Sequence, residues 1–431
     1  MLYENLSVNN QGVLTFAGQD TKNLAATYGT PLLLLDGDMV RSRCREYVQA
    51  MADFLPAGSK PFYASKALSY KGIYRMMREE NMGVDVVSAG ELYTALAAGF
   101  PPENVCFHGC SKTDADIRYA MEQGVGVFIC DSFQELEALD AEAARQNIRQ
   151  KILLRLQPGI DPHTHEKIST GNIDCKFGVA IETGQAAEFV TQALQKKNLE
   201  LLGYHCHIGS QIFDHVPFCD AAVMMLRFCK EMQEAQGYYP TVLNLGGGMA
   251  VPYTREESKV DYRENIRRIG LLLEETCGKM GLKVPVIYME PGRSIVGDAG
   301  MTLYQVVSTK TIPGFRNYVT IDGGMSDNPR YTLYESPYTV LPADRMNDAR
   351  DYVCTVGGCC CESGDLIQEN VSLPVPHRGD LLAVLTTGAY NYSMASNYNR
   401  VPRPPIVVVE QGKCTVAVRR ETLADIIQYD V

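Results

Sequence analysis

Short apolar runs alternate with amphipathic helical stretches from about residue 61 to residue 290. Helical segments such as 89–99, 133–146 and 218–236 separate the apolar runs, which are the length of single β-strands. This alternation indicates parallel strands joined by helical crossovers. The predicted strands are Phe62–Ser65, Val84–Val87, Val105–His108, Val127–Cys130, Ile152–Leu156, Leu201–His205, Val242–Leu245 and Val286–Met289.

Eight such strand-then-helix units, spread over roughly 230 residues, match the usual size of a TIM-type (β/α)8 barrel. A doubly wound sheet is the alternative. That fold more often carries a GxGxxG motif after its first strand, and none occurs here. We therefore expect a barrel over residues 36–297.

The pattern changes after about Gly297, where strand-like runs are separated by Gly and Pro turns. A hairpin is expected at Gln411-Gly412. The early strands, up to Leu35, have no partners within the predicted barrel, so we assign residues 1–35 and 298–431 to one antiparallel β domain. The expected later strands are Leu303–Thr309, Tyr318–Ile321, Tyr352–Val356, Leu381–Thr386, Ile406–Glu410 and Thr415–Arg419.

Composition narrows the class of protein. A net charge of −11 argues against a nucleic-acid binder, which needs a basic face. The chain has no apolar run long enough to span a membrane, and its first residues lack the features of a secretory signal. Fourteen cysteines scattered through a chain of this length favour reduced thiols in the cytoplasm. Paired CxxC motifs are absent, so no structural zinc or other metal is expected.

In a TIM barrel the active site lies at the C-terminal ends of the strands, here called the rim. Lys66 follows the first predicted strand and Ser69 is a candidate N-cap for the next helix. Desolvation lowers the pKa of a lysine held in apolar surroundings, and such an amine forms a Schiff base with a carbonyl. The alternative is a lysine that simply points into water.

Other rim positions carry charge, imidazole or glycine. Gly246-Gly247-Gly248 follows the seventh strand, where a phosphate site is common, although a tight turn is the alternative. Glu290 follows the eighth strand and suits a protonated pyridine nitrogen; Arg293 suits a carboxylate or phosphate, and a surface ion pair is the alternative for both. His207 offers a flat ring for stacking, or is a histidine satisfied inside the barrel. Together these residues match the aldehyde, phosphate, ring face and ring nitrogen of pyridoxal phosphate.

Motifs along nearly the whole chain support this interpretation. With them the sequence resembles the diaminopimelate decarboxylases, in the alanine-racemase-like, fold type III group of pyridoxal-phosphate enzymes. The motifs are Tyr63-Ala64-Ser65-Lys66-Ala67, Asp85-Val86-Val87-Ser88-Ala89-Gly90-Glu91-Leu92, His207-Ile208-Gly209-Ser210-Gln211, Leu245-Gly246-Gly247-Gly248, Glu290-Pro291-Gly292-Arg293-Ser294, Ile321-Asp322-Gly323-Gly324-Met325, Cys361-Glu362-Ser363-Gly364-Asp365, Gly388-Ala389-Tyr390 and Ser393-Met394-Ala395-Ser396-Asn397-Tyr398-Asn399.

The resemblance implies a role for each matching residue. Lys66 would carry the cofactor, His207 would stack on its ring and Glu290 would pair with its nitrogen. The phosphate would be held by Ser210, Gly248 and Tyr390, and Gly246, Gly247, Gly292 and Arg293 are further residues expected to bind the cofactor. The distal end of the substrate would be bound by Arg293, Arg330, Tyr334, Glu362 and Tyr390, with Arg330 and Tyr334 in a loop of the β domain. Cys361 and Glu362 would come from the partner subunit of a homodimer, and Cys361 would donate a proton to the carbanion.

The implied activity is decarboxylation of meso-2,6-diaminopimelate to L-lysine and CO2, the last step of lysine biosynthesis. A related decarboxylase of ornithine, arginine or carboxynorspermidine, an amino-acid racemase and a catalytically silent regulatory homologue are the alternatives. The polar run Ser326–Arg330 and the extra thiols Cys359 and Cys360 depart from the family pattern. The loop from Gly159 to Lys176 has little periodicity, and we expect a mobile cover there.

Overall fold

The computed structural model describes residues 3–160 and 174–431. The expected cover loop therefore lies largely outside the described residues. The chain divides into two compact units. The first comprises residues 1–42, 251–259 and 295–431, and the second comprises residues 43–250 and 260–294.

The second unit is a closed barrel of eight parallel strands, which confirms the predicted fold class. Closure is made where β13 pairs with β5, through Tyr288 opposite Lys60, and where β8 pairs with β9, through Phe128 opposite Ile152. A short β10 (Val179–Ala180) pairs with β9 outside the ring. The strands, in barrel order, are β5 (Lys60–Ala64), β6 (Gly83–Val86), β7 (Val105–Phe107), β8 (Val127–Cys130), β9 (Gln150–Gln157), β11 (Leu199–His205), β12 (Val242–Asn244) and β13 (Val286–Met289).

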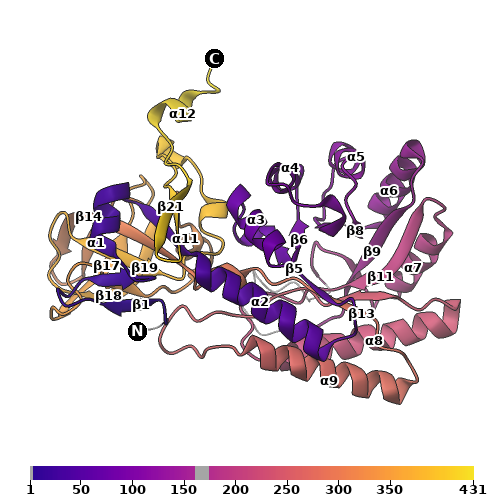
Figure 1. Ribbon diagram of the computed structural model, residues 1–431. Helices are drawn as coiled ribbons and strands as arrows, with labels where there is room; N and C mark the ends of the chain where they lie inside the picture. Colours follow the sequence, from indigo (N-terminus) through magenta and orange to yellow (C-terminus); the bar gives the residue numbers. More distant parts are fainter. Residues whose placement is uncertain (1–2, 161–173) are drawn as a thin grey trace. The chain divides into compact units, whose positions relative to one another are not determined.

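Apolar side chains from different strands meet in a buried cluster that includes Phe62, Cys106, Val127 and Leu153. Burial of each such side chain stabilises the fold by about 1.5–3 kcal/mol. In Figure 1 the helices of this unit surround the strands. They are α3 (Lys71–Glu79), α4 (Ala89–Ala97), α5 (Asp114–Glu122), α6 (Phe133–Gln146), α7 (Gln185–Gln195), α8 (Val216–Gln236) and α9 (Tyr262–Met280), together with most of α2 (Gly37–Phe54).

Side-chain caps start several of these helices directly after a strand. Ser88 accepts the backbone N–H of Glu91 at α4, and Ser132 accepts that of Glu135 at α6. Such caps satisfy backbone donors that the first helical turn leaves unpaired. The prediction of Ser69 as an N-cap was wrong: α3 begins at Lys71, its N-cap is Tyr70, and no side chain caps it.

The first unit is built around β14 (Gly300–Ile312), which pairs with β4 (Leu32–Asp36), β15 (Arg316–Ile321) and β19 (Leu381–Leu385). Most pairings are antiparallel, as expected, while β15–β17 and β4–β20 are parallel. The remaining strands of this sheet are β16 (Val340–Pro342), β17 (Tyr352–Gly357), β18 (Leu366–Leu373), β20 (Ile406–Glu410) and β21 (Lys413–Val418). A separate sheet contains β1 (Leu6–Val8), β2 (Leu14–Phe16) and β3 (Gln19–Asp20).

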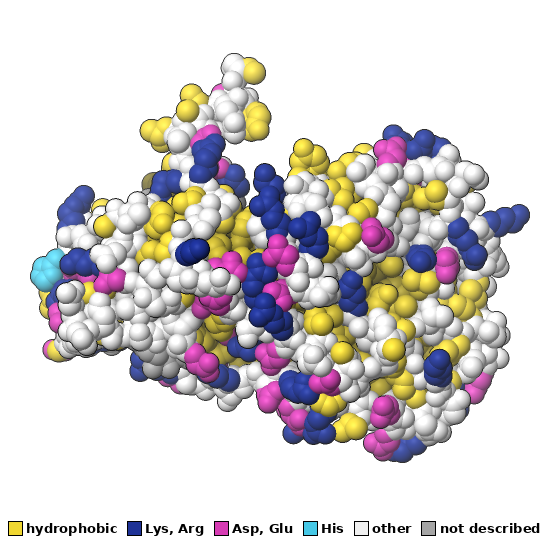
Figure 2. Space-filling model, in the orientation of Figure 1, with side chains coloured by type: hydrophobic (Ala, Val, Ile, Leu, Met, Phe, Trp, Pro, Cys, Tyr) yellow, Lys and Arg dark blue, Asp and Glu magenta, His cyan; other side chains and the backbone are white. Residues whose placement is uncertain are grey.

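Small helices complete this unit: α1 (Thr21–Tyr28), α10 (Arg293–Val296, at the boundary of the units), α11 (Arg330–Tyr334) and α12 (Leu423–Ile427). The β20–β21 hairpin turns at Gln411 and Gly412, both at positive φ, as predicted. None of the helices among the described residues is long and apolar enough to cross a membrane. Positive and negative side chains are interspersed on the face drawn in Figure 2.

Candidate active site

Lys66 lies at the C-terminal rim of the barrel, in a single 3-10 turn, Ser65–Ala67, that directly follows β5. Its side chain is exposed, whereas its neighbours Ser65 and Ala67 are fully buried. Backbone and side-chain bonds hold the strand end: the Ala64 N–H donates to Pro291 O at 3.0 Å, and the buried Tyr63 hydroxyl donates to Leu68 O at 2.9 Å. The accessible amine of Lys66 is therefore carried by a segment that hydrogen bonds hold in place.

Glu290 lies on the same rim, directly after β13, and is 7% exposed. Three side chains from other strands meet its carboxylate. Asn244 Nδ2, at the end of β12, donates to Oε1 at 2.6 Å, and His205 Nε2, at the end of β11, lies 3.1 Å from Oε2. His108 Nε2, directly after β7, lies 2.8 Å from Oε1.

The electrostatics of this cluster favour an ionised Glu290. Burial raises the pKa of a carboxyl group, but the neighbouring His108 and His205 outweigh it and hold the pKa of Glu290 well below its usual range. Burial lowers the pKa of His205 to about 4 despite the attraction of Glu290, so the ring is neutral near pH 7. The pKa of Asp85 is raised, chiefly by burial, with His108 and Lys66 acting in the opposite direction. Asp85 lies inside β6.

The glycine loop after β12 is closely packed on its neighbours. A Cβ at Gly247 would come within 1.9 Å of Glu290 O, and one at Gly248 would come within 2.3 Å of Gly209 O. Gly246 and Gly248 also have φ values of +69° and +122°, which favour glycine. The Gly247 N–H donates to His207 Nδ1 at 3.3 Å, so the loop fixes the imidazole that was predicted to stack on the ring.

Arg293 and Ser210 are brought together, as the rim rule predicts for the loops after β13 and β11. Arg293 Nη2 donates to Ser210 Oγ at 3.0 Å, and the arginine is 5% exposed. A Cβ at Gly292 would meet the Cβ of Ala64 at 3.0 Å, so this glycine allows the loop to pass close to the strand that precedes Lys66. Guanidinium and hydroxyl donors next to a backbone loop suit an anionic group.

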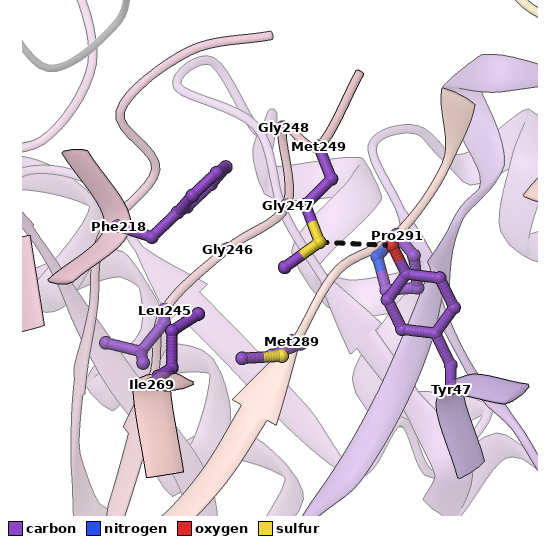
Figure 3. A pocket seen from close by; sticks show the side chains of 10 residues that line it. All are labelled: Tyr47, Phe218, Leu245, Gly246, Gly247, Gly248, Met249, Ile269, Met289 and Pro291. Atoms are coloured by element: carbon purple, nitrogen blue, oxygen red, sulfur yellow. Dashed lines mark hydrogen bonds between the residues drawn. The ribbon is translucent and has the colours of Figure 1, made fainter. Parts of the chain in front are cut away.

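An apolar hollow of about 330 Å³ borders the glycine loop (Figure 3). Its lining side chains are almost all apolar, and the Tyr47 hydroxyl donates to Met249 Sδ at 3.5 Å. Tyr47 also bonds Ser294 Oγ at 2.8 Å. The side chains that line this hollow do not suit a phosphate. It is lined by Tyr47, Phe218, Leu245, Gly246, Gly247, Gly248, Met249, Ile269, Met289 and Pro291.

The remaining predicted site residues belong to the other unit, where three segments converge. Cys361 and Glu362 are exposed in the loop between β17 and β18. The Cys361 N–H donates to Asn399 Oδ1 at 2.7 Å, and the Thr332 hydroxyl donates to Gly364 O at 2.8 Å. The thiol loop, α11 and the segment around Asn399 thus form one local cluster.

Arg330 was expected in a loop, and this was wrong: it begins α11 and is 4% exposed. Its Nη2 donates to Ser336 Oγ at 2.9 Å, and its guanidinium lies 4.8 Å from the ring centroid of Tyr253. Tyr334 ends α11 and is half-buried. Tyr390 has φ of 60°, a backbone conformation that bulky residues rarely adopt and that is common at functional sites.

A family model for the pyridoxal binding domain of pyridoxal-dependent decarboxylases matches residues 38–297, which span the whole barrel. The chain belongs to the pyridoxal-dependent decarboxylases, and the protein is thus an enzyme that uses pyridoxal phosphate.

Among the pyridoxal-dependent decarboxylases, the chain is similar to diaminopimelate decarboxylases. It is 44% identical to the diaminopimelate decarboxylase of Bacillus subtilis over 98% of this chain and 96% of the relative. The crystal structure of the M. jannaschii diaminopimelate decarboxylase in complex with L-lysine matches 99% of this chain and 98% of that chain, at 31% identity and a TM-score of 0.90. The Helicobacter pylori diaminopimelate decarboxylase with L-lysine gives 0.85 at 30% identity, over 95% and 98% of the two chains.

The barrel residues fit pyridoxal phosphate. An ionised buried carboxylate, Glu290, suits a protonated ring nitrogen, the accessible Lys66 suits an aldehyde, and the paired Arg293 and Ser210 suit a phosphate. Sequence reasoning missed the contacts of His205 and Asn244 with Glu290. A signal was present: both are polar residues at the C-terminal ends of barrel strands, where the active site of such a fold lies.

Proposed function

We propose that this enzyme decarboxylates meso-2,6-diaminopimelate to L-lysine and CO2. The observation that carries the proposal is the full-length similarity to diaminopimelate decarboxylases, since it includes both the barrel lysine and the Cys-Glu loop. Pyridoxal phosphate, when bound, supplies an electron sink for the charge left on the α-carbon as the carboxylate departs. The roles below belong to residues of the chain itself.

Barrel residues would hold and orient the cofactor. Lys66 would hold the cofactor through its aldehyde group. Glu290 would accept the hydrogen bond of the ring nitrogen and keep its proton in place, while His207 would lie against the ring face. Ser210 would hold the phosphate through its hydroxyl, with Gly246, Gly247, Gly248, Gly292, Arg293 and Tyr390 around it.

Residues of the other unit would recognise the far end of the substrate and complete the proton transfer. Diaminopimelate carries an ammonium and a carboxylate at that end, and Glu362 and Arg330 offer the opposite charges. Tyr334, Arg293 and Tyr390 would assist in binding this end. Cys361 would deliver the proton to the α-carbon after CO2 leaves.

The decisive assay supplies the purified protein with pyridoxal phosphate and meso-diaminopimelate and measures CO2 and L-lysine. Equimolar release of both products is expected. The same assay with ornithine, arginine or carboxynorspermidine should give little CO2. Release from one of those substrates but not from diaminopimelate would assign a different decarboxylase activity, and no release from any would favour a silent homologue.

We also propose a homodimer in which Cys361 and Glu362 of one chain complete the site of the other. Both residues are exposed on their loop, and α12 with the residues after it exposes large apolar side chains, including Leu423 (76%), Ile427 (59%) and Tyr429 (87%). Exposed apolar surface of this kind is typical of an interaction site. Figure 2, in the orientation of Figure 1, shows hydrophobic side chains on the surface of the segment around α12.

Mixing two inactive variants tests the shared site. Lys66→Ala and Cys361→Ala chains, combined after mild dissociation, should recover about a quarter of wild-type activity, because about half of the dimers are mixed and each mixed dimer has one intact site. No recovery from a mixture that sedimentation shows to contain dimers would contradict a shared site.

We place the enzyme in the cytoplasm, because all fourteen cysteines are reduced thiols, as in a reducing compartment. Cell fractionation with an antibody checks this assignment, and recovery in a secreted fraction would contradict it.

A further inference from the structure

The buried surroundings of Glu290 contain two histidines to which neither the resemblance nor the proposed mechanism gives a role. His108 and His205 are 4% and 1% exposed, come from β7 and β11, and approach the two carboxylate oxygens separately. Their rings meet edge to face, with centroids 4.9 Å apart. Asn244, fully buried, shares Oε1 with His108.

The hydrogen bonds to Glu290 require Asn244 and His205 to act as donors. An ionised carboxylate has no proton to give, so every partner of Glu290 must supply one. Asn244 does so through its amide nitrogen. For His205 this fixes the tautomer: Nε2 carries the hydrogen, and the buried Nδ1, which has no partner among the described residues, keeps only a lone pair.

Two histidines and a glutamate are also a ligand set that zinc uses, and their ligand atoms lie within 4.8 Å of one another. The contact pattern favours hydrogen bonding. A metal-bound histidine donates its other ring N–H to an oxygen acceptor, and such an acceptor is missing at Nδ1 of His205 among the described residues. Asn244 also occupies Oε1 as a donor.

We propose that His108 and His205 are positioning residues that orient Glu290 and keep it ionised before the cofactor binds. This inference rests on the proposed role of Glu290 toward the ring nitrogen. His205 hydrogen-bonds one carboxylate oxygen and the His108 ring lies 2.8 Å from the other, so the two rings hold the carboxylate from both sides. Without them, burial alone would favour the protonated acid, which cannot sustain a protonated ring nitrogen in the same way.

The test compares replacements that remove the donor with replacements that keep one. His205→Phe and His108→Phe lose the N–H, whereas His205→Gln and His108→Gln retain a side-chain N–H. The apoenzymes are titrated with pyridoxal phosphate, and the absorbance spectrum of the bound cofactor is recorded at one fixed pH. The exposed His377→Gln serves as the control, because His377 lies in the other unit.

Each Phe variant should bind the cofactor roughly tenfold or more weakly, the effect of losing one hydrogen bond to a charged group, and should shift its absorbance band. The Gln variants should recover most of the affinity and the wild-type band, and His377→Gln should match wild type. Unchanged affinity and spectrum in both Phe variants would overturn the proposal, as would stoichiometric zinc in the apoenzyme that disappears in His205→Phe. If a Phe variant fails to fold, a Gln variant that folds but does not restore the band overturns it equally.

These outcomes are separable from failure of the proposed function. A wild-type protein that binds pyridoxal phosphate but releases no CO2 from diaminopimelate would refute the substrate, while the affinities and spectra would still decide the role of the two histidines.

Discussion

Each unit has a buried carboxyl group next to predicted site residues, and the two units supply its hydrogen-bond donors differently. In the barrel, Glu290 is approached by side chains from three other strands, Asn244, His205 and His108. In the other unit, Asp365 accepts backbone N–H groups, from Met325 at 2.6 Å and Cys360 at 2.7 Å. The side chains around Glu290 keep its carboxylate ionised, whereas the bonds to Asp365 fix the backbone path of the loop that contains Cys361.

The backbone arrangement has a steric consequence. A Cβ at Gly358 would come within 2.3 Å of the Asp365 carboxylate, and one at Gly324 would come within 2.5 Å. Both glycines let the chain pass close to Asp365, which ties the segment before Cys361 to the segment after β15. Asp365 therefore holds the backbone of the segment that carries Cys361.

The largest effect on activity is expected from a substitution in the barrel unit. Lys66→Ala should lower CO2 release more than a thousandfold, because the amine that binds the cofactor is removed. The exposed Lys71→Ala, five residues along, is the matched control and should retain wild-type activity. Steady-state CO2 release and the visible absorbance of the loaded protein are the measurements. A Lys66→Ala protein that keeps both would remove this residue from the site.

The second largest effect on activity is expected from a substitution in the loop that contains Cys361. Cys361→Ala should slow product formation on the order of a hundredfold, the usual contribution of one general acid. Cys359→Ala, at an exposed position two residues earlier, should stay near wild type and is the control. Equal losses in the two variants would indicate a structural role for the triple-cysteine segment.

A smaller loss is expected from the group that holds this loop. Asp365→Asn replaces one acceptor by an NH2 group, so one of the two backbone N–H groups loses its partner. We expect roughly a tenfold loss of activity and a changed rate of Cys361 alkylation, measured by mass spectrometry in a Cys359→Ala background. The exposed Asp348→Asn is the control. An unchanged alkylation rate together with unchanged activity would refute the loop-holding role.

The difference between side-chain donors at Glu290 and backbone donors at Asp365 also explains how much could be predicted from the sequence. The eight barrel strands were predicted because each is a short apolar run between helical patterns, and Val127–Cys130 and Val286–Met289 match β8 and β13 in both bounds. Lys66 and Glu290 could be proposed for the site because a barrel places its active site directly after its strands.

Backbone-mediated features could not be predicted in this way. Every non-proline residue has an N–H group, so nothing in the sequence marks Met325 and Cys360 as partners of Asp365. The same holds for Arg330, whose helix α11 is only five residues long and depends on tertiary contacts such as the Thr332–Gly364 bond. β18 was also not predicted, since its polar residues Gln368, Glu369 and Asn370 hide the strand pattern.

The smallest expected effect concerns the protonation of a buried carboxyl group in each unit, Glu290 and Asp327. Glu290 is held ionised, whereas burial raises the pKa of Asp327 to about 7 despite hydrogen bonds from Tyr304 and the Gly324 N–H. Between its ordinary pKa of 3.8 and this native value, the folded protein binds the proton more tightly than the unfolded chain. The stability from this group is thus fully present below pH 3.8 and is lost as the pH rises through 7.

Asp327→Asn removes this titration, because the amide stays neutral at every pH. The free energy of unfolding of wild type minus that of Asp327→Asn should therefore fall by roughly 2 kcal/mol from pH 5 to pH 7, at no more than about 1.4 kcal/mol per pH unit. Urea unfolding of both proteins at several pH values measures this difference, in which groups that titrate alike in the two proteins cancel. A difference that does not change with pH would mean that Asp327 is ionised in the native state, and the contrast with Glu290 would then lie only in the type of donor.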